Sequence, residues 1–221
     1  GSSDVQLLEL TNAYCTVANN GMHHDPVIIS KIVDKDVKTV YENNTEAEQV
    51  IPYKSAFLMQ QLLLGGTHEP GGTSQSLLAA EYAGGARDTD FGGKTGTSNN
   101  HSDAWFEGVS PNLVVGAWVG GEYRSIHFRT GALGQGSRTA LPIVGLFLHY
   151  VMDDPAFQKY HGRFKKPTAD DGITSDMYVC QSYQPRVVRD TTRVDSSRVI
   201  SDQEVFLDEN GEPIENQSSE E

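Results

Sequence analysis

The sequence predicts an α/β (α+β) fold, an antiparallel sheet of about five strands with helices on its faces. Residues 7–18 repeat apolar side chains at helical spacing, and residues 52–64 have a proline in the first turn and two glycines after the end. Three strand-like runs then follow one another at residues 91–98, 104–109 and 113–119. Because short, turn-rich joints connect antiparallel neighbours, we expect these runs to form a meander.

The first predicted helix covers about residues 7–18. Residues 2–4 offer Ser and Asp as N-caps, and the Asn-Asn-Gly string at 19–21 ends the helix because these residues tolerate a left-handed backbone. Cys15 falls inside this helix, where we expect it to pack as a small core residue.

Two short strands are predicted next, at residues 27–33 and 37–41, with the Asp-Lys-Asp string at 34–36 as their turn. The second helix follows at about residues 52–64, and Gly65-Gly66 is expected to stop it.

Further elements are expected along the rest of the chain. A weak helical patch lies near residues 74–82, and the glycine-rich segment 131–136 is expected to be a flexible loop. The run at 113–119 is almost continuously apolar, which predicts a central strand covered on both faces. A final helix is expected from Thr139, its candidate cap, to about Met152.

Charge is distributed unevenly along the chain of 221 residues. The formal net charge is -13, but residues 199–221 hold eight acids and no base, which leaves 22 acids and 17 bases before them. We therefore expect a folded domain at residues 1–166 and, at 167–221, an extension with an acidic, disordered tail. The acidic balance argues against nucleic-acid binding, and no apolar run approaches the ~18 residues of a membrane span.

Metal and disulfide chemistry have little support in the sequence. The two cysteines, Cys15 and Cys180, fit neither a disulfide scaffold nor a zinc site, and whether they pair stays open. The adjacent histidines His23 and His24 point apart and lie beside a turn proline, so we expect no metal site and no cofactor.

Residues 92–97, with the sequence Gly-Gly-Lys-Thr-Gly-Thr, are the strongest candidate site. On a strand, Thr95 and Thr97 point to one side while Lys94 and Gly96 point to the other. Gly96 has no side chain to block a ligand that lies against the backbone. The plain structural alternative is a polar edge strand in which the lysine guards against aggregation.

A family resemblance extends this motif. The string K-T-G is one of three signatures of penicillin-binding proteins and class A β-lactamases, with S-x-x-K and S-D-N. K-T-G-T-S-N-N at 94–100, D-A-W-F-E-G at 103–108 and V-G-A-W-V-G at 115–120 resemble the transpeptidase domain of class A (bifunctional) penicillin-binding proteins. Residues 1–21 resemble the helix after the family's S-x-N motif, and residues 140–143 resemble the start of its last helix.

The sequence departs from the family at the nucleophile. The family uses the serine of S-x-x-K, and no serine here has a lysine three residues later. The literal S-x-N match at 98–100 directly follows K-T-G, whereas the family places that motif upstream, so we interpret Ser98 as a strand-to-turn residue. The resemblance covers about residues 1–165, and we expect the chain to be a C-terminal piece whose nucleophile lies before Gly1.

The resemblance implies acyl transfer. In the family a serine attacks the D-Ala-D-Ala carbonyl of a peptidoglycan stem peptide, and D-Ala leaves as an acyl-enzyme forms. An amine from a neighbouring peptidoglycan strand then resolves the acyl-enzyme. It assigns Lys94 and Thr97 catalytic roles: Lys94 stabilises charge, and the Thr97 N–H is half of an oxyanion hole. Thr95, Gly96 and Thr97 would bind the substrate, including its terminal carboxylate. β-Lactams, which resemble D-Ala-D-Ala, are implied as covalent ligands.

The resemblance also implies partners and a location. The upstream half of the same protein would complete the domain at the periplasmic face of the inner membrane, with anchor and signal outside this chain. Alone, the chain is expected to be inactive and to self-associate through its exposed sheet side, and a strictly monomeric chain would contradict this. The alternatives are a stand-alone, non-catalytic peptide- or partner-binding module and, less well supported by the D-A-W-F and W-V-G blocks, a β-lactamase-like hydrolase.

Residues around the motif are interpreted as structural. Trp105 is expected to pack beneath the K-T-G strand and Trp118 to lie in the core. Asn99, Asn100 and His101 are expected to form the turn after the strand.

Overall fold

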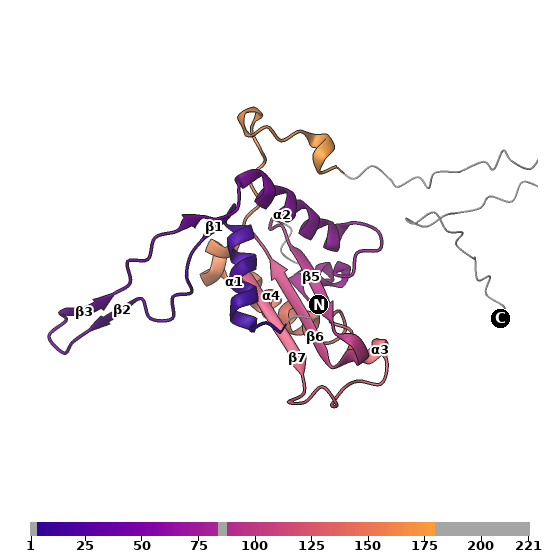
Figure 1. The fold of residues 1–221 in the computed structure, drawn as a ribbon. Helices are drawn as coiled ribbons and strands as arrows, with labels where there is room; N and C mark the ends of the chain where they lie inside the picture. Colours follow the sequence, from indigo (N-terminus) through magenta and orange to yellow (C-terminus); the bar gives the residue numbers. More distant parts are fainter. Residues whose placement is uncertain (1–3, 84–87, 180–221) are drawn as a thin grey trace, which may run out of the picture. The chain divides into compact units, whose positions relative to one another are not determined.

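The computed structural model describes residues 4–83 and 88–179, and its first compact unit runs to Tyr178. The unit contains a three-stranded antiparallel sheet with helices packed against it (Figure 1). This confirms the predicted mixed fold. The expected count of about five strands is wrong, because the predicted strands near residues 27–41 pair with each other in a separate hairpin.

The sheet consists of β5 (Gly92–Thr97), β6 (Asp103–Val109) and β7 (Val114–Gly120) in the order β5-β6-β7. Both pairs are antiparallel, as the short joints predicted. The expectation that the third run is the central strand is wrong. In a meander the second strand lies between its neighbours, so β6 is central and has five buried residues, whereas β7 has one.

Helices lie on both faces of this sheet. A Cβ atom on Gly92 would approach Leu63 of α2 (Tyr53–His68), and one on Gly116 would approach Thr11 of α1 (Leu7–Ala18). A Cβ atom on Gly108 would meet Val144 of α4 (Ala140–Asp153) on the opposite face. The predicted helices are therefore present, with α1 and α2 on one face and α4 on the other.

The helix starts differ from the predicted caps. Gln6 is the N-cap of α1 and makes no side-chain hydrogen bond there, while residues 2 and 3 lie outside the described residues. Thr139 is the N-cap of α4, but its hydroxyl donates to Gln135 O at 3.0 Å instead of capping the helix.

The predicted stop of α2 at Gly65-Gly66 is wrong, because the helix continues to His68. Gly66 lies against β5, where a Cβ atom would come within 2.8 Å of the Gly93 carbonyl oxygen. The glycine therefore permits close helix–strand packing and does not end the helix.

Gly66→Ala is expected to destabilise the chain by about 1–3 kcal/mol, because the added methyl group must push α2 away from β5. Gly65→Ala is the matched control: its Cβ would meet only the Glu69 Cγ at 3.6 Å, and alanine favours the helix by up to about 1 kcal/mol. Urea unfolding of the two variants measures the difference. Equal destabilisation by both would contradict the packing role of Gly66.

Two apolar clusters hold the layers together. The larger lies between the sheet and α4 and includes Phe91, Phe106, Leu141 and Leu148, all buried. The smaller contains Ala18, Leu63 and Val109 on the face that carries α1 and α2. The carboxyl side chain of Glu107 is also buried on this second face, in contact with α1.

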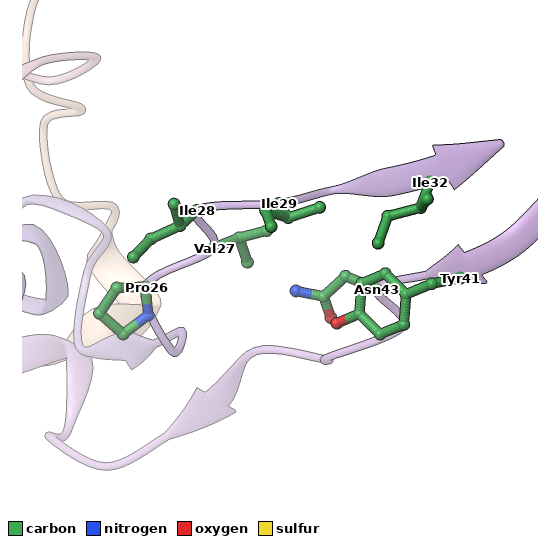
Figure 2. A pocket seen from close by; sticks show the side chains of 7 residues that line it. All are labelled: Pro26, Val27, Ile28, Ile29, Ile32, Tyr41 and Asn43. Carbon is green, nitrogen blue, oxygen red and sulfur yellow. The ribbon is translucent and has the colours of Figure 1, made fainter.

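A long arm leaves the body after α1 (Figure 1). Its base is the pair β1 (Met22–His23) and β4 (Glu48–Gln49), and its outer part is the hairpin of β2 (Lys31–Val33) and β3 (Thr39–Glu42). A hollow of about 380 Å³ lies along the arm. Figure 2 shows the side chains that line it: Pro26, Val27, Ile28, Ile29, Ile32, Tyr41 and Asn43.

The remaining elements are short. The segment predicted as a flexible loop contains one helical turn, α3 (Gly131–Gly134), and the predicted patch near 74–82 contains a 3-10 turn at Gln75–Leu78. Other 3-10 turns lie at Asn99–His101, Pro155–Tyr160, Ala169–Asp171 and Ser175–Met177.

The segment up to Tyr178 packs on α2. Lys54 Nζ donates to Gly172 O at 2.9 Å, and the rings of Phe57 and Tyr178 meet edge to face at 5.2 Å. Cys180 and the acidic tail lie outside the described residues. Within the described ranges, no helix is both long and apolar enough to span a bilayer.

Candidate functional site

The candidate strand β5 has one edge paired with β6 and one edge that faces away from it. Phe91 O accepts a hydrogen bond from Thr67 Oγ1 at 2.7 Å, and Gly93 O accepts one from Ser74 Oγ at 3.3 Å. In an antiparallel strand the peptide groups alternate between the two edges. The odd-numbered residues of β5 therefore face the outer edge, and α2 and the loop after it cover that edge at its first half.

The second half of this edge carries the K-T-G residues. The exposed Lys94 donates from Nζ to Thr95 O at 2.6 Å, which places the ammonium at the outer edge. By the same alternation, the backbone N–H and C=O of Thr97 face this edge as well. A cation, two hydroxyls and outward peptide groups thus gather at one strand end.

The two threonine hydroxyls already have neighbours in the chain. Thr95 Oγ1 shares a hydrogen bond with Thr73 Oγ1 at 2.8 Å. Thr97 Oγ1 accepts from the Gly136 N–H at 3.1 Å, so the loop after α3 is tied to the end of β5. Gly136 must be small, because a Cβ atom there would lie 2.5 Å from Gly96 O.

The expected alternation of side chains along β5 is present. Lys94 pairs in register with Glu107 and Gly96 with Trp105, on the face that carries α1. A Cβ atom on Gly96 would come within 3.0 Å of the Trp105 Cβ. This confirms that Trp105 packs beneath the strand.

The turn after β5 is held by a polar network around Asp103. Its carboxylate accepts hydrogen bonds from Ser98 Oγ at 3.0 Å, Ser102 Oγ at 2.9 Å and Trp118 Nε1 at 3.1 Å. Burial favours the neutral acid, but these bonds and the nearby Arg124 together hold the pKa of Asp103 below its ordinary value. The carboxylate is therefore ionised at neutral pH.

Trp118 is not the core residue that the apolar run predicted. Its side chain is 41% exposed, and its indole N–H is bound to Asp103. The ring lies 6.2 Å from that of Trp105, on the same face of the sheet. The error follows from placing β7 at the centre, since the outer edge of β7 is unpaired within the described ranges.

Asn100 and His101 form the turn, as predicted. Both have left-handed backbones, with φ of 61° and 58°. Beyond the turn and the end of β7 lies a hollow of about 230 Å³, lined by His101, Ser102, Val119, Gly120, Gly121, Ile126, His127 and Phe128. Lys94 and Thr97 line neither this hollow nor the one on the arm (Figure 2).

Sequence reasoning missed Glu107. Its side chain is only 2% exposed in the central strand, and Thr11 Oγ1 lies 3.2 and 3.1 Å from its two carboxylate oxygens. Burial raises the pKa of Glu107 to about 7, against the lowering effect of the Thr11 hydrogen bond. Burial, and then the charge of Glu107, also raise the pKa values of Tyr14 and Cys15. The only sequence signal was an acid inside an apolar run.

The histidines of the arm bond to protein groups. His23 Nδ1 lies 3.1 Å from Thr16 Oγ1, and the two ring nitrogens of His24 lie 2.8 Å from the carbonyl oxygens of Asp25 and Thr45. Across the described ranges, no group of three or more His, Cys, Asp or Glu side chains is arranged to hold a metal ion.

Comparison with known proteins identifies the family. The sequence profile described as the penicillin binding protein transpeptidase domain matches residues 1–118. The chain belongs to this family. Penicillin-binding protein 1A of Aquifex aeolicus is 36% identical over 143 residues, which are 65% of this chain and 18% of that protein. Penicillin-binding protein 1B of Escherichia coli is 30% identical over 124 residues, 54% of this chain and 13% of that protein.

Solved structures agree on the fold. The crystal structure of penicillin-binding protein 1A from Haemophilus influenzae matches 76% of this chain with a TM-score of 0.61 and 22% identity, over 28% of its own length. The penicillin-binding protein PonA1 from Mycobacterium tuberculosis matches 73% with a TM-score of 0.54 and 19% identity, over 41% of its length. The resemblance to class A penicillin-binding proteins is thus confirmed. The chain spans less than a fifth of the length of these two curated relatives.

Proposed function

We propose that this chain carries the substrate-binding strand of a peptidoglycan D,D-transpeptidase, and that the serine nucleophile comes from a part of the protein outside these 221 residues. The family membership gives the reaction class, and the chain has no S-x-x-K string. We refer below to the full-length product of the gene as the complete transpeptidase.

The outer edge of β5 is the observation that carries this proposal. Its peptide groups at Thr95 and Thr97 point away from β6, and the Lys94 ammonium lies beside them. An extended peptide can add to such an edge as a further strand, with main-chain hydrogen bonds for affinity and side chains for specificity. In the proposed complex, the stem peptide that ends in D-Ala-D-Ala lies along this edge in an extended form.

Each group at this edge has a role in the proposed reaction. The Thr97 N–H donates to the oxyanion that forms when the serine adds to the D-Ala-D-Ala carbonyl. Lys94 supplies positive charge for the proton transfers, and the hydroxyls of Thr95 and Thr97 bind polar groups of the peptide, including its carboxylate. Gly96 lets the peptide approach the backbone. A β-lactam would acylate the same serine.

Labelling with a fluorescent penicillin tests the proposal. The 221-residue chain alone is expected to give no covalent band on a denaturing gel, whereas the complete transpeptidase is expected to give a stable one. A band on the chain alone would place an acylated serine within these residues and overturn the proposal. No band on either protein would favour the alternative, a non-catalytic peptide-binding module on the same scaffold.

A further inference from the structure

The turn that follows β5 begins one residue after the proposed oxyanion donor. Ser98 comes directly after Thr97, and it is bound through both its backbone and its side chain. Its N–H donates to Asp103 O at 2.9 Å, and its Oγ accepts from the Asp103 N–H at 2.8 Å. Ser98 Oγ also donates to Asp103 Oδ2 at 3.0 Å. Asp103 therefore holds Ser98, the residue after Thr97, by three hydrogen bonds.

We call these three hydrogen bonds between Ser98 and Asp103 the clasp. The turn needs the clasp because its own backbone is strained. Asn100 and His101 are consecutive residues with positive φ, a conformation that costs free energy in residues other than glycine. Such a conformation persists only where surrounding contacts over-determine it. The contacts of Asp103 close the turn across its two ends.

The clasp is also anchored to the rest of the sheet. Trp118 of β7 donates from Nε1 to Asp103 Oδ1 at 3.1 Å, and Ser102 Oγ donates to Oδ2 at 2.9 Å. The carboxylate is ionised at neutral pH, which strengthens hydrogen bonds from neutral donors. The end of β5 is thus tied through Asp103 to the far strand of the sheet.

We propose that Asp103 is a positioning residue that holds the Thr97 N–H in the direction required of an oxyanion donor. The inference rests on the proposed function, because Thr97 has this task only in a transpeptidase. Oxyanion stabilisation depends on donors held in place before the reaction. The Thr97 N–H belongs to the Gly96–Thr97 peptide, and a shift of Ser98 would turn that peptide through the Thr97 backbone and so weaken the stabilisation.

A double-mutant cycle in the complete transpeptidase tests the inference. Asp103→Ala is expected to lower the rate constant of acylation by a fluorescent penicillin by about tenfold. Thr97→Pro removes the N–H itself, so in the Thr97→Pro background Asp103→Ala is expected to change the rate less than twofold. A purely structural role would give the same loss in both backgrounds, and that result would overturn the inference.

Matched variants separate the clasp from general effects. Asp34 Oδ1 accepts from the N–H groups of Asp36 and Lys38 in the turn of the arm, so Asp34→Ala removes similar bonds away from β5 and is expected to leave acylation unchanged. If Asp103→Ala does not fold, Trp118→Phe removes one donor to the carboxylate and is expected to slow acylation two- to threefold, roughly.

The outcomes also distinguish the two proposals. Acylation of the wild type that is lost in Thr97→Pro but kept in both Asp103→Ala and Trp118→Phe would overturn the positioning role alone. A wild type that penicillin does not label, or a Thr97→Pro variant that reacts at the wild-type rate, would overturn the proposed function and the inference with it.

Discussion

Thr97→Pro is expected to slow acylation of the complete transpeptidase by a β-lactam by about 10²–10³-fold, the loss typical of removing one oxyanion donor. Proline has no backbone N–H, and in the proposed mechanism the Thr97 N–H binds the oxyanion. Thr97 is the last residue of β5, and its peptide groups face the edge away from β6. The substitution therefore takes no hydrogen bond from the ladder, and proline is tolerated at this type of strand position.

The hydroxyl of Thr97 needs a separate control, because it accepts from the Gly136 N–H. Thr97→Ala removes the hydroxyl but keeps the backbone N–H, so it is expected to react within about tenfold of the wild type. The second-order rate constant with a fluorescent penicillin is measured for both variants. Equal losses in the two would assign the effect to the hydroxyl and contradict the role of the N–H.

The sequence predicted the elements better than their arrangement. Short joints predicted the antiparallel meander of β5, β6 and β7, because chain geometry allows little else. Apolar content alone placed β7 at the centre, but the position of a strand in a meander depends on its order, and β6 is central. The two strands predicted near residues 27–41 pair with each other in the arm and do not join the sheet. The sequence could not show this, because a pattern of residues does not specify the partner of a strand.

Glycines were the least reliable signals. Gly66 was interpreted as a helix stop, whereas its role is set by the Gly93 carbonyl, 27 positions away in sequence. Gly136 was expected in a flexible loop, but it packs closely against the backbone of Gly96. In the sequence, a glycine that permits close packing cannot be told from one that ends a helix. Only the fold shows which residue lies against it.

The sequence predicted those features of the candidate site that depend on β5 alone. The spacing of Lys94, Thr95, Gly96 and Thr97 sets their alternation, and the structure has it. The outward direction of the Thr97 peptide group required knowledge of which edge pairs with β6. The network around Asp103 joins residues from two strands and a turn, and Trp118 enters it from a position that looked apolar.

Glu107→Gln is expected to stabilise the 221-residue chain by about 3 kcal/mol at pH 8.5 and by less than about 1 kcal/mol at pH 5. Glu107 is buried against α1, and burial raises its pKa from 4.5 to about 7. The folded chain thus binds the proton more tightly than the unfolded chain. The stabilisation from the protonated carboxyl is fully present below pH 4.5, and it is lost as pH rises through about 7.

The size of the effect follows from the shift. Each unit of pKa shift corresponds to about 1.4 kcal/mol of folding stability. A rise of this size therefore lowers the stability of the wild type by about 3 kcal/mol as pH rises from below the unfolded pKa to above the folded pKa. Glutamine has nearly the same shape and carries no charge, and its amide oxygen can still accept from Thr11 Oγ1. It therefore resembles the protonated acid and does not titrate.

Urea unfolding at pH 5 and pH 8.5 measures the prediction. The wild type is expected to lose stability over this range relative to Glu107→Gln, because ionisation leaves a charge buried beside the Thr11 hydroxyl. Glu122→Gln changes an exposed glutamate after β7 and is expected to shift stability by less than about 0.5 kcal/mol at either pH. A constant difference between wild type and Glu107→Gln across the range would mean that Glu107 titrates in the folded chain as it does in the unfolded one. The position would then owe its stability to packing against α1, and the raised pKa would be wrong.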